Sequence, residues 1–248
     1  MSIYSKLNKM HTPKHIGIIM DGNGRWAREK GKKRIFGHIE GVKTVKKIVN
    51  AVLKLNIPYL TLFAFSKENW ERPKKEVDLL MNLFLSTITE NQNHFYKNKI
   101  KINTIGSIHD LPSSCQEALL KIIDTTKKNT ELTLTLALSY SSRLEITHAV
   151  QKIIDKERPL SADLITPSLI EKYLQTYNIP DPELLIRTSG EKRISNFLLW
   201  QIAFSELYFS EKKWPDFDEE ELYIAIFEYQ KRERRFGKTT EQIEHEKF

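Results

Sequence analysis

Residues 15–26, His-Ile-Gly-Ile-Ile-Met-Asp-Gly-Asn-Gly-Arg-Trp, form the stretch that decides the fold. The apolar run at its start is typical of a buried strand, and a glycine-rich turn follows it. The glycines let backbone N–H groups approach a ligand, and the helix start beside Arg25 favours an anion. Asp21 falls at the carboxyl end of the strand, where open α/β sheets bind ligands. A carboxylate beside an anion site indicates a divalent metal.

The same stretch has a simpler interpretation. Asp-Gly and Asn-Gly are common turn formers, so the segment can also be a plain strand-to-helix turn with an Asx cap. A short glycine motif does not decide between these two interpretations.

The composition favours an anionic partner and a reducing compartment. The 248-residue chain has 39 Lys+Arg against 32 Asp+Glu, a formal charge of +7, which suits phosphates, acidic lipids or nucleic acid. The single cysteine, Cys115, excludes an internal disulfide. Residues 1–14 lack the apolar core of a signal peptide, and the stretches 57–65 and 197–204 are too short to span a bilayer. We therefore expect a soluble cytoplasmic protein, with peripheral membrane contact left open.

Apolar runs alternate with helix-forming stretches along the whole chain. No repeat, low-complexity segment or linker appears, so we predict one domain over 1–248, with mobile tails at 1–14 and 238–248. The expected strands are the run from residue 15 and those at 59–65, 99–105, 132–138, 184–186 and 204–209. The expected helices are 42–55, 75–95, 113–128, 143–156, 161–175 and 218–235. This alternation predicts an α/β fold with a mostly parallel central sheet flanked by helices.

The helix expected over 75–95 is apolar nearly all round in its first three turns. Such a helix is either packed on every side, which is the commoner case, or faces an apolar cavity as well as the core.

A second polar cluster follows the short strand at 184–186. There the sequence runs Arg-Thr-Ser-Gly-Glu-Lys-Arg-Ile-Ser-Asn over 187–196. Arg187, Arg193 and the Ser195 hydroxyl suit a second diphosphate, because the guanidinium fork matches phosphate oxygens. Glu206 lies among aromatic and aliphatic residues, where a carboxylate needs a metal or a cationic partner. A metal site and a buried Arg–Glu ion pair both remain open for it.

Two anion sites, two candidate metal carboxylates and a very apolar helix suggest an enzyme that handles diphosphates with apolar tails. A third polar cluster, at residues 66–73, ends the strand expected at 59–65. The sequence has no P-loop, no Gly-x-Gly-x-x-Gly after the first strand and no Cys/His cluster for zinc. It also lacks the Asp-Asp-x-x-Asp motif of the helical trans-prenyltransferases.

The chain resembles the cis-prenyltransferases, the family of the bacterial undecaprenyl diphosphate synthases, from about Pro13 to Gly237. The motifs that carry the resemblance lie at 15–26, at 37–41 (Gly-His-x-x-Gly), at 63–73 (Phe-Ala-Phe-Ser-x-Glu-Asn-Trp-x-Arg-Pro), at 184–209, at 214–217 and at 232–237. The resemblance implies a single domain with an apolar tunnel for the growing chain, walled by the helix at 75–95. Ala64 is a small residue of the kind that leaves room for long products.

The resemblance also implies a role for each motif residue. Mg²⁺ is held by Asp21, the main catalytic residue, and by Glu206. The allylic primer, expected to be farnesyl diphosphate, is held by Gly22, Asn23, Gly24, Arg25, Arg34 and His38, with Trp26 at the mouth. Isopentenyl diphosphate is held by Arg187, Arg193, Ile194 and Ser195, and the site is lined by Ser66, Lys67, Glu68, Trp70 and Arg72. Asn69 is assigned as the proton acceptor, but a neutral amide is a poor base. We therefore expect Asn69 to position groups, with a diphosphate oxygen as the final acceptor.

The implied activity is the synthesis of a long polyprenyl diphosphate, the carrier lipid for cell-wall polysaccharides, by a homodimer that touches the membrane surface to release product. Two other function classes stay open. One is a noncatalytic accessory subunit, which the presence of Asp21, the arginines and Glu206 disfavours. The other is a nucleic-acid-binding protein, which the lack of aromatic residues among the basic ones disfavours.

The chain departs from the family pattern in two places. Ser139-Tyr140-Ser141-Ser142-Arg143 stands where many members have Asn-Tyr-Gly-Gly-Arg, which changes the turn if either glycine needs a positive φ. Lys192 stands where some members have a histidine, and a protonated lysine does not bind a metal. We therefore restrict the expected metal ligands to Asp21 and Glu206.

Overall fold

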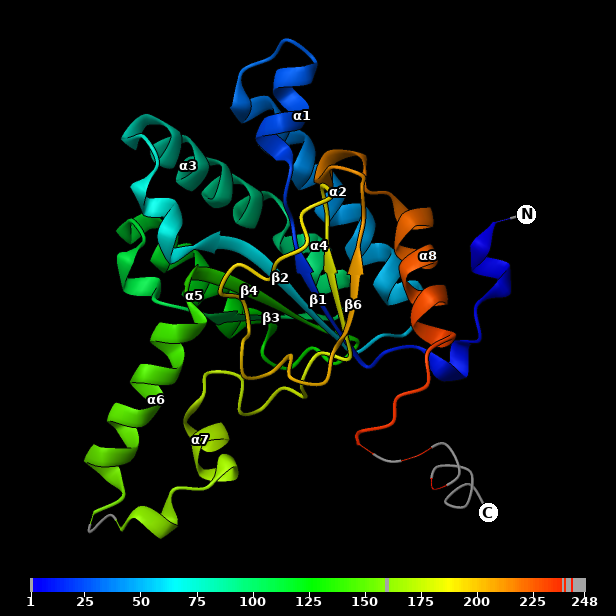
Figure 1. The fold of residues 1–248 in the computed structure, drawn as a ribbon. Helices are drawn as coiled ribbons and strands as arrows, with labels where there is room; N and C mark the ends of the chain where they lie inside the picture. Colours follow the sequence, from blue (N-terminus) through cyan, green and yellow to red (C-terminus); the bar gives the residue numbers. More distant parts are fainter. Residues whose placement is uncertain (1, 159–160, 238, 240–241, 243–248) are drawn as a thin grey trace.

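The computed structural model describes residues 2–158, 161–237, 239 and 242. Its described part contains one sheet of six strands, all parallel, in the order β3-β4-β2-β1-β5-β6 (Figure 1). The strands are β1 (His15–Ile19), β2 (Tyr59–Ser66), β3 (Ile100–Ile105), β4 (Leu132–Tyr140), β5 (Leu184–Arg187) and β6 (Glu206–Phe209). The expected α/β fold with a parallel central sheet is therefore confirmed.

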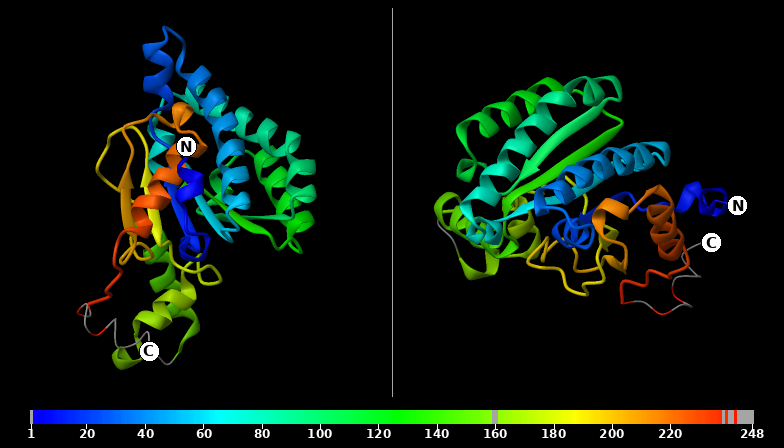
Figure 2. Two further views of the ribbon diagram at one scale, coloured as in Figure 1. Left: turned by 90° about the vertical axis from the view of Figure 1, so that its right-hand side faces the viewer. Right: turned by 90° about the horizontal axis from the view of Figure 1, so that it is seen from above.

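Helices cover the sheet, as the alternating pattern predicts. They are α1 (Asn23–Glu29), α2 (Arg34–Lys54), α3 (Lys74–Glu90), α4 (Gln92–Lys97), α5 (Ser113–Thr126), α6 (Ser142–Lys156), α7 (Pro167–Tyr173) and α8 (Glu219–Gln230). Figure 2 shows α5, α3, α2 and α8 side by side in one layer, and neighbouring members of this row are in contact. Among the described residues, no helix is both long and apolar enough to cross a bilayer.

The two faces of the sheet bury cores of different size. Because strand side chains alternate between faces, Ile16 and Ile18 of β1 point into the large core beneath the helix row. Ile19 points into a smaller core on the other face, together with Phe197 and Leu198 from the segment after β5. The central strands β1 and β5 are thus buried on both sides, which explains why they appear as continuous apolar runs, whereas the edge strands β3 and β6 are partly exposed.

Several helix boundaries differ from the prediction. The helix expected at 42–55 begins eight residues earlier, at Arg34, because Gly37 and Gly41 belong to it and are not part of a loop. A Cβ at Gly37 would lie 1.9 Å from the carbonyl oxygen of Asn23, so the glycine lets α1 and α2 touch. The helix expected at 75–95 is broken at Asn91 into α3 and α4.

The later elements are also shorter than predicted. The helix expected at 161–175 is the shorter α7, and a separate 3-10 turn at Ala162–Leu164 precedes it. The helix expected at 218–235 ends at Gln230, and the strand expected at 204–209 begins only at Glu206.

The amino-terminal segment lies against α8. It forms two 3-10 turns, Ile3–Lys6 and Lys9–His11. The ring of Tyr4 lies 5.2 Å from that of Tyr223, and Gln230 Nε2 donates to the Asn8 carbonyl at 2.6 Å. The tail predicted at 1–14 therefore contacts α8 at several residues, although most of its described side chains are exposed. The tail predicted at 238–248 lies outside the described residues, except for 239 and 242.

His15, buried at the start of β1, makes stability depend on pH. Burial lowers the pKa of His15 from 6.5 to about 4, and its ring nitrogens lie 2.5 Å from the Pro180 carbonyl and 2.8 Å from Thr61 Oγ1. In the unfolded chain the His15 ring takes up a proton near pH 6.5, whereas in the folded chain the ring stays neutral down to about pH 4. We expect the free energy of unfolding to fall by about 3 kcal/mol through this residue as the pH falls from 7 to 4.

Urea unfolding at several pH values tests this expectation, with His15→Gln as the comparison. The variant is expected to be less stable at pH 7 but to lose less stability between pH 6.5 and 4. Equal slopes for the two proteins would contradict the assignment to His15.

Candidate active site

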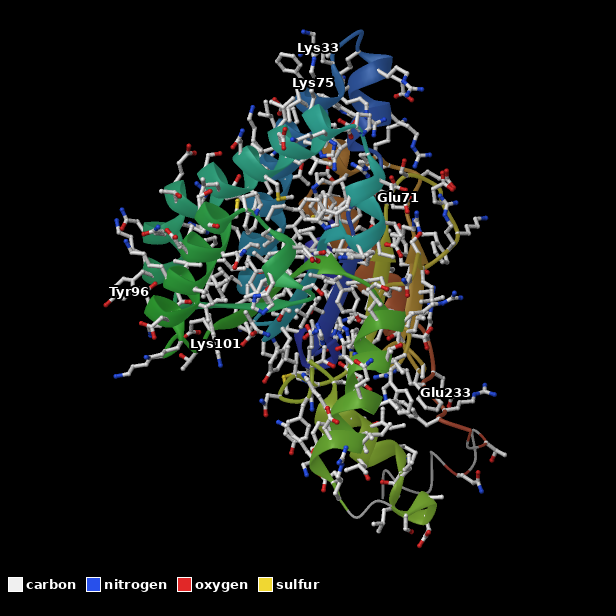
Figure 3. The ribbon with its side chains drawn as sticks, turned by 90° about the vertical axis from the view of Figure 1, so that its left-hand side faces the viewer. Lys33, Glu71, Lys75, Tyr96, Lys101 and Glu233 are labelled. Atoms are coloured by element: carbon white, nitrogen blue, oxygen red, sulfur yellow. The ribbon has the colours of Figure 1, made fainter. Side chains whose placement is uncertain are left out.

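A cavity of about 820 Å³ runs from the carboxyl ends of the central strands into the space between the sheet, α2 and α3. Its deep walls are apolar and come from Leu62, Leu80, Leu83, Phe84, Leu136 and Leu138. Its polar side chains at the strand ends are Asp21, Asn23, His38, Ser66, Glu68, Asn69, Arg72, Arg187, Ser195 and Asn196. Figure 3 shows Lys75 near the start of α3 and Tyr96, on α4, far from it along this helical layer. Because Leu80, Leu83 and Phe84 of α3 line the cavity, the expected apolar helix does face a cavity as well as the core.

Asp21 lies two residues beyond the end of β1. Its Oδ2 accepts hydrogen bonds from Arg187 at 3.0 Å and Arg25 at 3.1 Å, and its Oδ1 accepts from the Gly22 N–H at 2.6 Å. Burial opposes ionisation, but the Arg187 hydrogen bond and the charges of both arginines outweigh it, so the pKa of Asp21 lies below its ordinary value. Gly22 has φ of 103°, a conformation that side chains rarely adopt.

The turn after β5 carries the second group of arginines. The buried Arg187 donates to Ser195 Oγ at 2.7 Å and to the Arg193 carbonyl. Glu191 pairs with Arg25 at 2.7 Å and also with Arg193. The two arginine-bearing turns predicted from sequence therefore meet, with Asp21 and Glu191 between their positive charges.

A third group comes from the 3-10 turn η3 (Lys67–Glu71), which follows β2. Ser66 and Asn69 form a capping box, in which Asn69 Oδ1 accepts from the Ser66 N–H at 3.1 Å. Trp70 Nε1 donates to Ser139 Oγ at 2.9 Å, and Lys67 pairs with Asp110 at 2.9 Å. Because its side-chain Oδ1 accepts from the Ser66 N–H, Asn69 stabilises the backbone conformation of this turn.

His38, on the second turn of α2, lies at the mouth with an unpartnered side chain. Its Nε2 is buried and has no hydrogen-bond partner. Burial and the neighbouring charge of Arg72 lower the pKa of His38 to about 4, so the ring is neutral at pH 7. Arg34 and Arg72 both pair with Glu76, each at 3.3 Å. The ring and the two guanidinium groups are therefore close to one another.

The other predicted site residues lie around this mouth without lining the cavity. Trp26 Nε1 donates to Asp216 at 2.8 Å, and Lys30 lies 4.8 Å from the centre of its ring. Gly24 is covered by the Arg34 guanidinium, and Ile194 packs on the smaller core.

Glu206 does not join Asp21. It pairs with Arg232 at 2.9 Å and lies level with Leu184 and, through β5, with Ile16 at the amino end of the sheet. Asp21 is five residues further along, about 16 Å at the rise of a strand. Within one chain the two carboxylates are therefore too far apart to hold the same metal ion, and Glu206 forms a partly exposed ion pair with Arg232. The sequence does not show this separation, because Glu206 begins its short strand and does not end it.

The two serines at the glycine positions of the family pattern, Ser141 and Ser142, do not have a positive φ, although Ser139 just before them has φ of 46°. Ser141 has φ of −146° and caps α6, where its Oγ accepts from the Leu144 N–H at 3.4 Å. Ser142 Oγ accepts from the Leu199 N–H at 2.9 Å. Because neither position has a positive φ, the turn does not need the two glycines.

Among the polar residues around the mouth, Glu76, Glu191 and Asn196 were not predicted as site residues. The spacing of Arg72 and Glu76, four residues apart at a helix start, is a signal that could have identified Glu76. Nothing local marks Asn196, whose partners lie far away in the chain.

Comparisons with known proteins agree with this geometry. Residues 19–237 match the family described as putative undecaprenyl diphosphate synthase. An isoprenyl transferase of Chlorobaculum tepidum is 50% identical over 233 residues, 93% of this chain and 88% of the relative. A ditrans,polycis-undecaprenyl-diphosphate synthase of Micrococcus luteus, described as (2E,6E)-farnesyl-diphosphate specific, is 51% identical, covering 94% of each chain.

Two solved structures are also similar. Lavandulyl diphosphate synthase from Lavandula x intermedia, solved in complex with dimethylallyl diphosphate, has a TM-score of 0.89 and 36% identity, covering 92% of this chain and all of its own. A probable undecaprenyl diphosphate synthase from Campylobacter jejuni has a TM-score of 0.75 and 35% identity, covering 91% and 99%. The chain therefore belongs to the undecaprenyl diphosphate synthase family of prenyltransferases.

Proposed function

We propose that this enzyme condenses isopentenyl diphosphate with an allylic primer, farnesyl diphosphate, to make a long polyprenyl diphosphate with cis double bonds. The product we propose is undecaprenyl diphosphate, the carrier lipid for cell-wall polysaccharides. The observation that carries this proposal is the meeting of two arginine-bearing turns at Asp21, above an apolar cavity of about 820 Å³. Such a site can hold two diphosphates at its mouth and hydrocarbon inside it.

The primer diphosphate is assigned to the loop at 22–25, with Arg34 and His38 beside it. Arg25 and the N–H groups at the start of α1 donate to its oxygens, and the neutral His38 donates one ring N–H. Isopentenyl diphosphate is assigned to Arg187, Arg193 and Ser195. As the primer ionises, the arginines stabilise the charge that develops on the departing diphosphate.

Asp21 is the residue that we propose to hold Mg²⁺. The described residues contain no cluster of three or more acidic, histidine or cysteine side chains that could cage a metal. Mg²⁺ commonly binds through one carboxylate together with substrate phosphates and water, and a partly exposed Asp21 with a lowered pKa fits that mode. When bound, the ion would supply further stabilisation of diphosphate charge.

The attack of the isopentenyl double bond on the allylic carbon ends with loss of a proton. Asn69 is an amide engaged in capping η3, so we assign it to positioning and assign the proton to a diphosphate oxygen.

A condensation assay tests the proposed function. Purified protein is given farnesyl diphosphate, isopentenyl diphosphate and magnesium, with and without EDTA, and the products are sized by chromatography. Long products that vanish with EDTA are expected. If both diphosphates bind but no condensation occurs, the chain is an accessory subunit of an active partner.

We also propose that the enzyme is a homodimer at the inner face of the membrane. β6 is an edge strand, and next to it Phe204 is 69% exposed, with its ring 5.8 Å from that of the 58% exposed Phe236. Light scattering at micromolar concentration is expected to give twice the chain mass of 29.1 kDa. Phe204→Asp is expected to shift the protein toward the monomer, and a monomeric native protein would contradict the proposal.

A further inference from the structure

Asn196 joins three segments that are far apart in the sequence. Its Nδ2 donates to Glu68 Oε1 at 2.9 Å and to Ser141 Oγ at 2.7 Å. Its Oδ1 accepts from the Arg143 N–H at 3.1 Å, and its carbonyl oxygen accepts from the Ser142 N–H at 3.0 Å. The residue therefore contacts η3, the start of α6 and its own turn at once.

The backbone at Asn196 is held in an unusual conformation. Ser195 and Asn196 both have positive φ, 46° and 60°, and asparagine tolerates this region better than most side chains. The two N–H groups that it accepts belong to the first turn of α6, which has no partners for them inside the helix. The start of α6 thus fixes where Asn196 and Ser195 lie.

The Glu68 hydrogen bond crosses the mouth of the cavity. Glu68 belongs to η3, and both Glu68 and Asn69 of this turn line the cavity, beside Ser66 at the end of β2. Asn196 directly follows Ser195, whose Oγ accepts from Arg187. One hydrogen of the Asn196 amide goes to Glu68 in η3, and the other goes to Ser141 before α6. Because Asn196 adjoins Ser195, its side chain links the η3 side of the mouth to the Arg187 side.

We infer that Asn196 is a positioning residue that sets the spacing between the two substrates, an inference that rests on the proposed condensation. Its side chain is assigned no contact with either diphosphate. It acts by holding η3 and the turn at 193–196 at one separation. Misplacing reacting groups by about 1 Å can cost about a hundredfold in rate, so such a link affects turnover more than binding.

The test exchanges donor and acceptor across the link. Asn196→Asp keeps both acceptor contacts to α6, tolerates positive φ and can still receive a hydrogen bond from the Ser141 hydroxyl, but it places a carboxylate against Glu68. Adding Glu68→Gln supplies an amide donor to that carboxylate, which restores the hydrogen bond in the opposite direction. Asn93→Asp, at an exposed position on α4, is the matched control.

We expect Asn196→Asp to lower kcat roughly tenfold to a hundredfold, with little change in Tm or in the Kd of either diphosphate measured alone. In the Glu68→Gln background, Asn196→Asp is expected to lower kcat by a factor at least about tenfold smaller than in the native background. Equal losses of kcat in both backgrounds would overturn the inference, and so would a weakening of both Kd values that matches the loss of kcat. If the native enzyme itself makes no product, the proposed function fails and the inference fails with it.

Discussion

Replacing Asp21 by Asn is expected to lower kcat for condensation by roughly a hundredfold to a thousandfold, the size of effect seen when one preorganised electrostatic group is removed. The carboxylate lies between Arg187 and Arg25 and is the residue proposed to hold Mg²⁺. An amide carries no negative charge for the ion. It also leaves the buried Arg187 guanidinium without its anionic partner.

The measurement is single-turnover condensation with both diphosphates and magnesium, together with a thermal melt. Asp155→Asn, on the exposed surface of α6, is the matched control and is expected to keep full activity. A folded Asp21→Asn enzyme with native kcat would show that the Asp21 carboxylate is not required for the reaction.

Replacing Ala64 by Leu is expected to shorten the products. Phe63 pairs with Ala137 and Phe65 with Leu138, so Ala64 is the extra residue of a bulge in β2 and lines the cavity. A larger side chain there takes space from the growing hydrocarbon. Because overpacking costs about 1–3 kcal/mol, the share of the longest product should fall at least about fivefold.

Chromatographic sizing of the products measures this effect, and the first condensation step is expected to keep its rate. Ala162→Leu, in an exposed 3-10 turn away from the cavity, is the control for the same added volume. An unchanged product distribution in Ala64→Leu would show that the hydrocarbon does not pass this point.

The centre of the sheet could be predicted from sequence because β1 and β5 are buried on both faces and are therefore short, continuous apolar runs. Helix boundaries were harder to predict. Gly37 and Gly41 suggest a loop when only local propensity is considered, yet they lie inside α2, where a tertiary contact with Asn23 requires small residues. The break at Asn91 has no strong local signal either.

The site was predictable where a charged residue stands at or just after the carboxyl end of an apolar strand, as Asp21 and Arg187 do. Arg187 ends β5 and Asp21 follows the neighbouring parallel strand β1, so their side chains meet. The separation of Glu206 from Asp21 was not predictable, because composition does not tell which end of a four-residue strand a carboxylate occupies. Asn196 was missed because its role depends on Glu68, 128 residues away, and on the first turn of α6.

The turn after β5 contains five residues with positive φ between Ser189 and Leu198, namely Ser189, Gly190, Ser195, Asn196 and Leu198. Each non-glycine residue in this region costs of order 1 kcal/mol, which the smaller core beneath Phe197 offsets. The chain therefore spends folding stability to keep this segment ordered before any substrate arrives. An incoming diphosphate meets donors that have already lost their conformational freedom, so little entropy is lost when it binds.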